Sequence, residues 1–166
     1  MKMSGETNGV RVLDPPRWIE PHLICSTILK VQLHHENAKL PTKAYPRSAG
    51  YDLYAASPVE IPSKGQGVVE LGLSVGIQYG YYGQIAPRSS LALRGIAVGG
   101  GVIDSGYNGP VKVILYNHNP ESSYKINVGD RVAQMIIIPC PHFKVEKVES
   151  LDETQRGEGG FGSTGK

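Results

Sequence analysis

Glycine and proline recur along the whole chain, and this limits its possible folds more than any other feature. The 166 residues include 21 glycines and 12 prolines, which interrupt apolar segments before a long helix can form. The apolar runs that remain are short, often alternate with polar residues and end at turn residues. We therefore predict an all-β fold, a distorted antiparallel barrel or jelly roll that closes most of its strand edges.

Seven segments have the composition or alternation of strands. They are residues 28–33, 51–55, 67–77, 81–86, 111–116, 131–138 and 144–148. One helical turn is predicted at 89–93, and a hairpin is predicted over 102–116 with its bend at 105–109.

The chain divides into three predicted parts. Residues 1–26 mix glycine, proline and charge without periodicity, which is typical of a flexible leader. Residues 27–150 contain the predicted strands and form a β-barrel domain. Residues 151–166 form a glycine-rich C-terminal arm.

The charge balance and the cysteines argue against several classes of protein. A net charge of +2 without a run of Lys or Arg argues against a nucleic-acid partner. No stretch approaches the roughly 18 apolar residues that cross a bilayer, and the N-terminal region lacks the apolar core of a signal peptide. Cys25 and Cys140 lie far apart and match no metal-ligand spacing, which fits two free thiols in a reducing compartment. We expect a cytoplasmic or nuclear protein that is neither secreted nor membrane-bound.

The C-terminal arm has the chemistry of a phosphate-binding loop. Residues 156–166 contain five glycines, which let the main chain approach an anion, with hydroxyls at Ser163 and Thr164 and a guanidinium at Arg156. A Walker-type loop would continue into a helix, so we expect a free arm that folds over a ligand bound elsewhere. Phe161 suits stacking on a planar base. A flexible tail without a ligand is the alternative.

Asp104 is the candidate general base. It follows the glycines at 99–101, where main chain without side chains leaves room for a small planar ligand. An ionised carboxylate there could deprotonate a water for attack on phosphorus, or it could merely cap its own turn. Tyr107 could lie under a sugar and exclude a 2′-hydroxyl, or it could pack on a neighbouring strand.

Three other segments contain polar residues suited to anions or to a metal. Asp52 interrupts an apolar strand and needs donors or a cation if buried; it could serve a hydrated Mg²⁺ or pair with an arginine. Arg88 opens a helical turn and suits an anion, or it forms an internal ion pair with Asp130. Gln134 is the polar exception in an apolar strand and could reach a phosphate oxygen.

Five segments, in order, resemble the five sequence motifs of the trimeric dUTPases. They are residues 49–54, 86–92, 99–109, 129–134 and 156–165. The resemblance covers residues 28–166 and implies a jelly-roll homotrimer in which each active site takes residues from all three subunits. It also implies that the C-terminal arm is exchanged between subunits.

The resemblance implies hydrolysis of dUTP to dUMP and pyrophosphate with Mg²⁺ as cofactor, which limits uracil in DNA and supplies dUMP for dTMP synthesis. It implies that Asp104 activates the water that attacks the α-phosphorus, and that Tyr107 underlies the deoxyribose. The main chain near Gly101, Val102 and Lys112 is implied to read the uracil edge.

The other motif residues are implied to bind the triphosphate and the metal. Those at the α- and β-phosphates are Arg88, Ser89, Ser90 and Gln134. Those of the arm at the γ-phosphate are Arg156, Gly162, Ser163 and Thr164. Phe161 covers the uracil, Asp52 binds Mg²⁺ through water, and Asp130 belongs to a structural ion pair.

Two positions depart from the family pattern. Ser90 stands where a glycine is usual, and Gly106 replaces the usual acidic residue before the tyrosine. Both features occur in the related dCTP deaminases, whose glutamate should fall at Ile114, yet no glutamate lies between Val111 and Asn119. The other alternative is a protein of this fold that binds a nucleotide or a protein partner without turnover.

Overall fold

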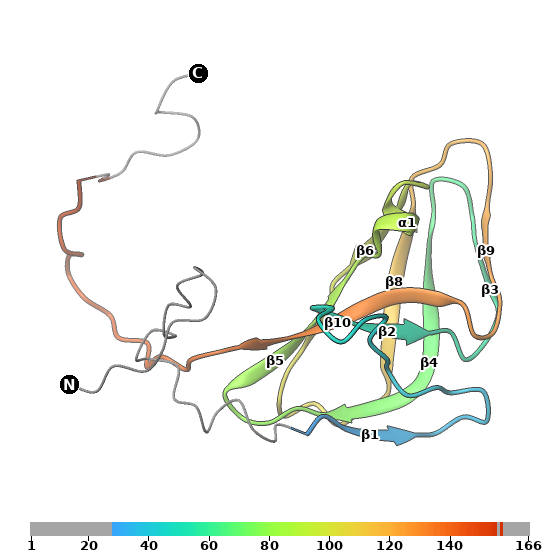
Figure 1. The fold of residues 1–166 in the computed structure, drawn as a ribbon. Helices are drawn as coiled ribbons and strands as arrows, with labels where there is room; N and C mark the ends of the chain where they lie inside the picture. The colour runs from blue at the N-terminus through green and yellow to red at the C-terminus, as the bar shows by residue number, and fades with distance from the viewer. Residues whose placement is uncertain (1–27, 156, 158–166) are drawn as a thin grey trace, which may run out of the picture.

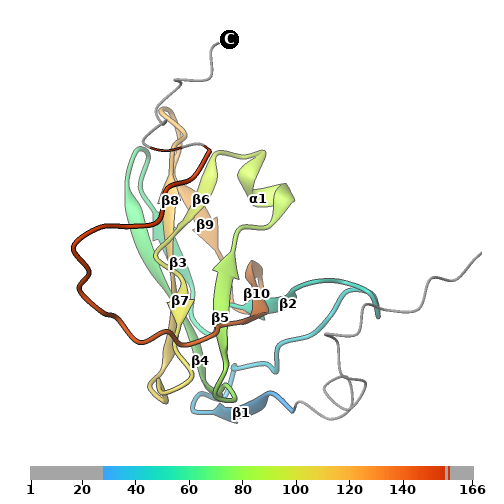
Figure 2. The same ribbon diagram turned by 90° about the vertical axis from the view of Figure 1, so that its left-hand side faces the viewer.

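The fold consists of antiparallel sheets, as the sequence predicts. The computed structural model describes residues 28–155 and 157, so the predicted leader and most of the arm lie outside the described residues. One sheet has the order β1 (Lys30–Leu33), β4 (Gln66–Gly76), β8 (Val111–Asn117), β6 (Ile96–Gly99). The other has the order β2 (Tyr51–Tyr54), β10 (Arg131–Pro139), β5 (Tyr81–Ala86), β7 (Val102–Ile103). Strands β3 (Val59–Ile61) and β9 (Tyr124–Ile126) form a small third sheet (Figures 1 and 2).

The core lies between the inner faces of these sheets. Side chains alternate strictly along β8, where Val111, Val113 and Leu115 are buried and the residues between them are exposed. Met135 of β10 and Leu53 of β2 are completely buried. Burial of each such side chain contributes about 1.5–3 kcal/mol to stability. The period-2 pattern of the sequence therefore fixes which face of each strand points inward.

Six of the seven predicted strands are confirmed to within one or two residues at each end. The predicted helical turn is confirmed as α1 (Ser89–Ala92). Sequence reasoning missed β3, β6, β7 and β9, which have two to four residues each and are too short for an alternating pattern to stand out. No helix in the described part of the chain is long and apolar enough to cross a membrane.

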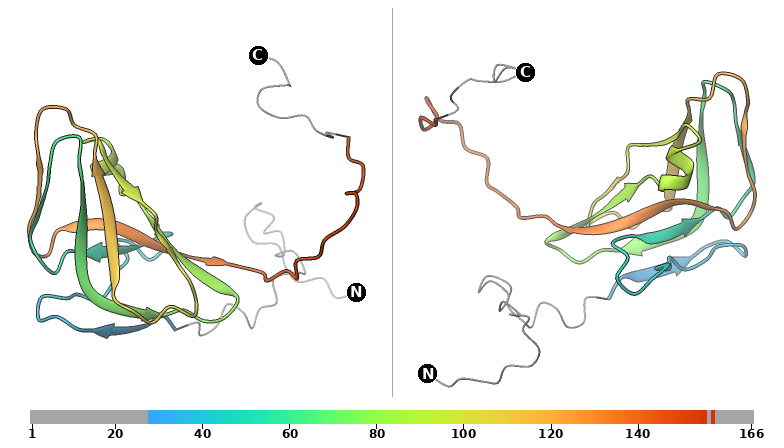
Figure 3. Two further views of the ribbon diagram at one scale, coloured as in Figure 1. Left: turned by 180° about the vertical axis from the view of Figure 1, so that it is seen from behind. Right: turned by 45° about the horizontal axis from the view of Figure 1, so that its top comes forward.

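The predicted strand at 144–148 is wrong. These residues form no strand, and the chain beyond β10 extends away from the sheets (Figures 1 and 3). Phe143 and Val145 are 84% and 94% exposed. The two valines of this segment, Val145 and Val148, are three residues apart, so a strand here would not present both of them on one face.

The predicted hairpin over 102–116 is also wrong. Strand β7 pairs with β5, whereas β8 pairs with β4 and β6. The bend between them therefore crosses from one four-stranded sheet to the other instead of joining two paired strands. This places Asp104 and Tyr107 on a link between the sheets.

Asn117 holds the end of β8 in place and is 1% exposed. Its Nδ2 donates to the carbonyl oxygens of Ile61 (3.3 Å) and Ser122 (2.9 Å), and its Oδ1 accepts from the Asn119 N–H (3.0 Å). One buried side chain thus connects β8, β3 and the loop before β9.

We predict that Asn117→Ala lowers the free energy of unfolding by about 1–3 kcal/mol, because the buried Ile61 carbonyl loses its side-chain donor. Urea unfolding at a fixed protein concentration measures this. His118→Ala, at the exposed neighbouring position, is the control and should change stability by less than about 0.5 kcal/mol. Equal effects of the two substitutions would contradict the role of Asn117.

Candidate active site

Asp104 lies on a depression of about 390 Å³ on the side of the molecule formed by β4, β7 and β8. The residues that line it are Val68, Val102, Ile103, Asp104, Tyr107, Pro110, Val111, Lys112 and Ile114. Most of this surface is apolar, with one carboxylate and one ammonium group at its margin. Its size is in the range of small-ligand pockets. The structure thus brings together four of the predicted site residues.

Gly101 directly precedes Val102, a residue that lines the depression, and its main chain lies against β5. The Ile85 N–H donates to the Gly101 carbonyl oxygen at 2.7 Å. Gly101 has φ +99°, and a Cβ there would lie 2.8 Å from the Ile85 oxygen. Only glycine allows this approach. The Gln84 side chain donates to the carbonyl oxygens of Ile85 (3.1 Å) and Gly101 (3.4 Å), a role that sequence reasoning missed.

The turn that carries Asp104 is closed by main-chain atoms and by Tyr107. The Tyr107 N–H donates to the Asp104 carbonyl oxygen at 3.0 Å, and the Tyr107 hydroxyl donates to the Pro110 oxygen at 2.9 Å. Within the described part of the chain, the Asp104 carboxylate accepts no protein hydrogen bond. The alternative in which this side chain caps its own turn is therefore not what the described residues show. The carboxylate is exposed at the depression.

Glu70 faces Lys112 across β4 and β8. The two side chains form an ion pair, with Nζ and Oε1 2.8 Å apart. The hydrogen bond to Glu70, followed by its negative charge, raises the pKa of the Lys112 ammonium, so this group is cationic at neutral pH. Glu70 was not among the predicted residues, since only the strand register reveals its position.

A second cluster forms around the Asp52 carboxylate, which is 8% exposed at residue level. Arg88 Nε donates to Oδ1 at 3.1 Å, and Arg131 Nη1 donates to Oδ2 at 3.2 Å. Gln134 pairs with Asp52 in the β2–β10 register, and its Nε2 donates to the Pro87 oxygen at 3.0 Å. Because β10 lies between β2 and β5, the fourth motif (129–134) lies beside the first (49–54) and the second (86–92).

The partner of Arg88 is Asp52, so the predicted alternative of an Arg88–Asp130 pair is wrong. Asp130 was expected to form a structural ion pair, but it forms none with the described residues. Its carboxylate instead accepts the Asn127 N–H at 2.8 Å. Ser89 and Ser90 are exposed in the first turn of α1, and no side-chain hydrogen bond caps that helix.

The chemistry of the Asp52 cluster suits at most an indirect metal contact. Among the described residues, no group of three or more His, Cys, Asp or Glu side chains converges as metal ligands. Both oxygens of Asp52 are bonded to arginines, but each retains lone-pair capacity for a water. A single carboxylate that reaches the ion through water is compatible with Mg²⁺, which keeps several water ligands.

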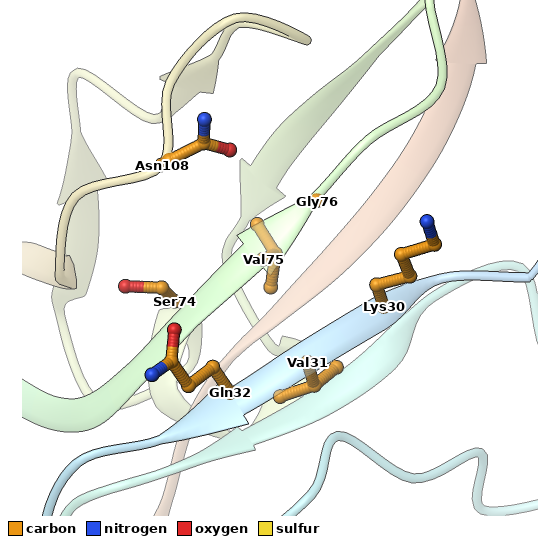
Figure 4. Close-up of a pocket in the computed structure, with 7 residues that line it drawn as sticks. All are labelled: Lys30, Val31, Gln32, Ser74, Val75, Gly76 and Asn108. Atoms are coloured by element: carbon orange, nitrogen blue, oxygen red, sulfur yellow. The ribbon is translucent and has the colours of Figure 1, made fainter.

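The two clusters are separate in the described chain. None of Asp52, Arg88 and Gln134 lines the depression that carries Asp104. Another depression of about 240 Å³ lies beside the β1–β4 ladder, and its lining includes Asn108, Ser74 and Gln32 (Figure 4). It also contains no residue of the Asp52 cluster. The predicted arm residues Arg156, Phe161, Gly162, Ser163 and Thr164 lie outside the described residues, and their roles stay predictions.

The fold and its two clusters define an all-β protein of the jelly-roll class with a carboxylate at a largely apolar depression. A family model described as dUTPase matches residues 36–165. The chain belongs to the dUTPase family.

Relatives and solved structures agree with this assignment. The deoxyuridine 5'-triphosphate nucleotidohydrolase of Yarrowia lipolytica is 52% identical over 140 residues, covering 82% of this chain and 88% of that protein. The protein of the same name from Oryza sativa is 49% identical over 148 residues, covering 87% and 86%. The Staphylococcus bacteriophage 80alpha dUTPase with dUpNHpp has a TM-score of 0.79 at 27% identity, covering 84% of this chain and 99% of that one. A mutant dUTPase of phage phi11, described with a structural Mg(II) ion, has a TM-score of 0.70 at 26% identity, covering 74% and 97%.

We predict that Asp52→Asn lowers the free energy of unfolding by about 1–3 kcal/mol, because two guanidinium groups lose their shared counter-charge. The expected loss is smaller than for a fully buried ion pair, because the Arg131 side chain is 48% exposed. Urea unfolding measures the change. Asp152→Asn, at an exposed position, is the matched control, and an equal response of both variants would contradict the proposed importance of the pairing.

Proposed function

We propose that the protein hydrolyses dUTP to dUMP and pyrophosphate, with Asp104 as the general base for a water that attacks the α-phosphorus. The observation that carries this proposal is the Asp104 carboxylate at the apolar depression, bonded to no other described residue. A carboxylate in this state can hold a water and take its proton as the water attacks.

The main chain of Gly101 and Val102 is proposed to read the uracil edge, with Lys112 beside it. Two observations support this assignment: Val102 and Lys112 line the depression, and the hydrogen bond from Ile85 fixes the main chain of the adjoining Gly101. Main chain fixed in this way can present donors and acceptors to a base. Tyr107 is proposed to support the deoxyribose. The hydrogen bond of its hydroxyl to Pro110 fixes the ring on its own loop before a ligand arrives.

The Asp52 cluster is proposed to hold the phosphates. Arg88, Ser89, Ser90 and Gln134 would bind the α- and β-phosphates through charge-assisted hydrogen bonds. Asp52 orients Arg88 and would contact Mg²⁺ through water. When bound, Mg²⁺ neutralises charge on the triphosphate.

We propose a homotrimer in which subunits share their active sites and exchange their C-terminal arms. In the described part of one chain, the phosphate cluster does not line the depression of Asp104, which is expected if a neighbour completes the site. The segment after β10, residues 140–155, extends away from the sheets (Figure 3), and its Val145 and Leu151 are 94% and 87% exposed. Apolar side chains so exposed on an extended segment favour a covering partner. Within this arrangement Arg156 and residues 162–164 would bind the γ-phosphate, and Phe161 would cover the uracil.

The departures from the family pattern do not favour deamination of dCTP. Ile114 lines the depression at the position expected for a deaminating glutamate, so no carboxylate is supplied there. Gly106 is not required by packing, because a Cβ at this position would meet nothing within 4 Å. The space for the usual acidic side chain is therefore retained.

We predict that the purified protein with Mg²⁺ releases pyrophosphate from dUTP in preference to dCTP, dTTP and UTP.

Asp104→Asn should lower kcat by about 10²–10⁴-fold with dUTP binding retained, because the amide cannot accept the proton of water. Pyrophosphate release and equilibrium binding of a non-hydrolysable dUTP analogue measure the two effects. Glu149→Gln, at an exposed acid in the segment after β10, is the control and should leave kcat unchanged. Ammonia from dCTP would indicate a deaminase, and unchanged turnover of Asp104→Asn would remove this residue from the mechanism.

We also predict that deletion of residues 156–166 lowers kcat/KM for dUTP by at least about tenfold with the trimer still assembled, because the deletion removes the proposed γ-phosphate and uracil contacts. Steady-state kinetics and light scattering measure the two properties. Full activity without these residues would exclude a closing role for the arm.

A further inference from the structure

The connection between the barrel and the arm is the feature on which our further inference depends. The last residue pairs of the β5–β10 ladder are Ile138 with Tyr82 and Pro139 with Tyr81. The pairing continues past the end of both strands, since the Cys140 N–H donates to the Gly80 oxygen at 2.7 Å. The chain that leaves β10 is thus still held to the turn before β5.

An aromatic contact follows directly. The rings of Tyr79 and His142 are stacked, with centroids 4.6 Å apart and an interplanar angle of 15°. Gly80 has φ +88°, a conformation that glycine adopts readily and that shapes the turn presenting Tyr79. Three successive contacts therefore lead outward from the barrel, namely Pro139 with Tyr81, Cys140 with Gly80, and His142 with Tyr79.

The contacts between the barrel and the arm end there. Among the described residues beyond His142, the one main-chain hydrogen bond outside helices and strands is Gly157 N–H to Thr154, within the arm itself. Phe143, the next residue, is 84% exposed. In Figures 1 and 3 the segment after β10 runs outward from the sheets without returning to them. The stacked pair is therefore the last point at which the barrel controls the path of the arm.

We propose that Tyr79 and His142 form an aromatic clasp that fixes the direction in which the arm leaves the barrel, and that both are positioning residues for the reaction. This inference rests on the proposed function, in which the arm closes over the site of a neighbouring subunit. A fixed exit direction raises the effective concentration of the arm tip at that site. Opening the clasp would lengthen the free segment by only a few residues, and the entropic cost of bringing the arm to its site depends weakly on that length. The direction in which the arm leaves the barrel therefore matters more than its length.

Loss of either ring is expected to lower kcat/KM for dUTP by about 3- to 10-fold, the factor to which an aromatic pair of this kind corresponds. The variants are Tyr79→Ala and His142→Ala, with Tyr79→Phe and His142→Phe as ring-retaining variants that restore the rate. In the double alanine variant the losses should be smaller than multiplicative, because either substitution alone already opens the clasp. Tyr45→Ala is the matched control, since Tyr45 and Tyr79 are 75% and 74% exposed.

A second measurement separates an open clasp from a damaged barrel. Trypsin cleavage after Lys144, two residues from the stacked His142, should accelerate by a similar factor in the alanine variants, with the urea midpoint of the barrel unchanged. Cleavage after Lys147, which lies beyond the last contact with the barrel, is the internal reference and should not change. The ring-retaining variants should be cleaved at the rate of the unmodified protein. Alanine variants with unchanged cleavage and unchanged kcat/KM would overturn the clasp, and so would a loss of activity that phenylalanine does not restore.

The outcomes distinguish the clasp from the proposed function. If deletion of residues 156–166 abolishes activity and the alanine variants behave like Tyr45→Ala, the closing arm stands and the clasp is overturned. If the deletion leaves activity intact, the closing role is overturned, and the catalytic role of the clasp with it. Accelerated cleavage together with a restorable loss in kcat/KM supports both.

Discussion

The buried carboxylate of Asp52 is the constraint around which one half of the candidate site is built. A negative charge that is 8% exposed needs compensating donors, and Arg88 and Arg131 supply them at 3.1 and 3.2 Å. These arginines belong to the start of α1 and to β10, so the requirement of one carboxylate joins three distant segments. In the proposed function, Arg88 would bind phosphate with a guanidinium that Asp52 already holds in position.

Much of the fold could be predicted because its longer strands alternate over a buried face. Strand β8 illustrates this, with every second side chain buried from Val111 to Asn117. Residues 144–148 show the limit of the method, since Val145 and Val148 give this segment the composition of a strand and it forms no strand. The two valines are three residues apart, so they would not share one face of a strand. Composition without alternation is therefore a weak basis for predicting a strand.

The sequence allows candidate site residues to be proposed one by one, but it does not reveal the contacts that support them. Asp104, Arg88 and Gln134 lie in short motifs with recognisable chemistry. Glu70 and Gln84 act through cross-strand neighbours, and their positions follow from strand register that a single sequence does not reveal. The same reason explains why Arg88 was linked to Asp130 in one interpretation and is bonded to Asp52 in the structure.

The close approach of Gly101 to β5 has a consequence for how this protein can diverge. If main chain reads the ligand, as proposed for Gly101 and Val102, the recognising groups belong to no side chain that a single base change in the coding sequence could exchange. Substitutions at Val68 or Ile114 alter the lining of the depression and leave the Gly101 carbonyl hydrogen-bonded to Ile85. Under the proposed function, such substitutions would leave the contacts made by the Gly101 main chain in place, and a new preference there would require β5 to move.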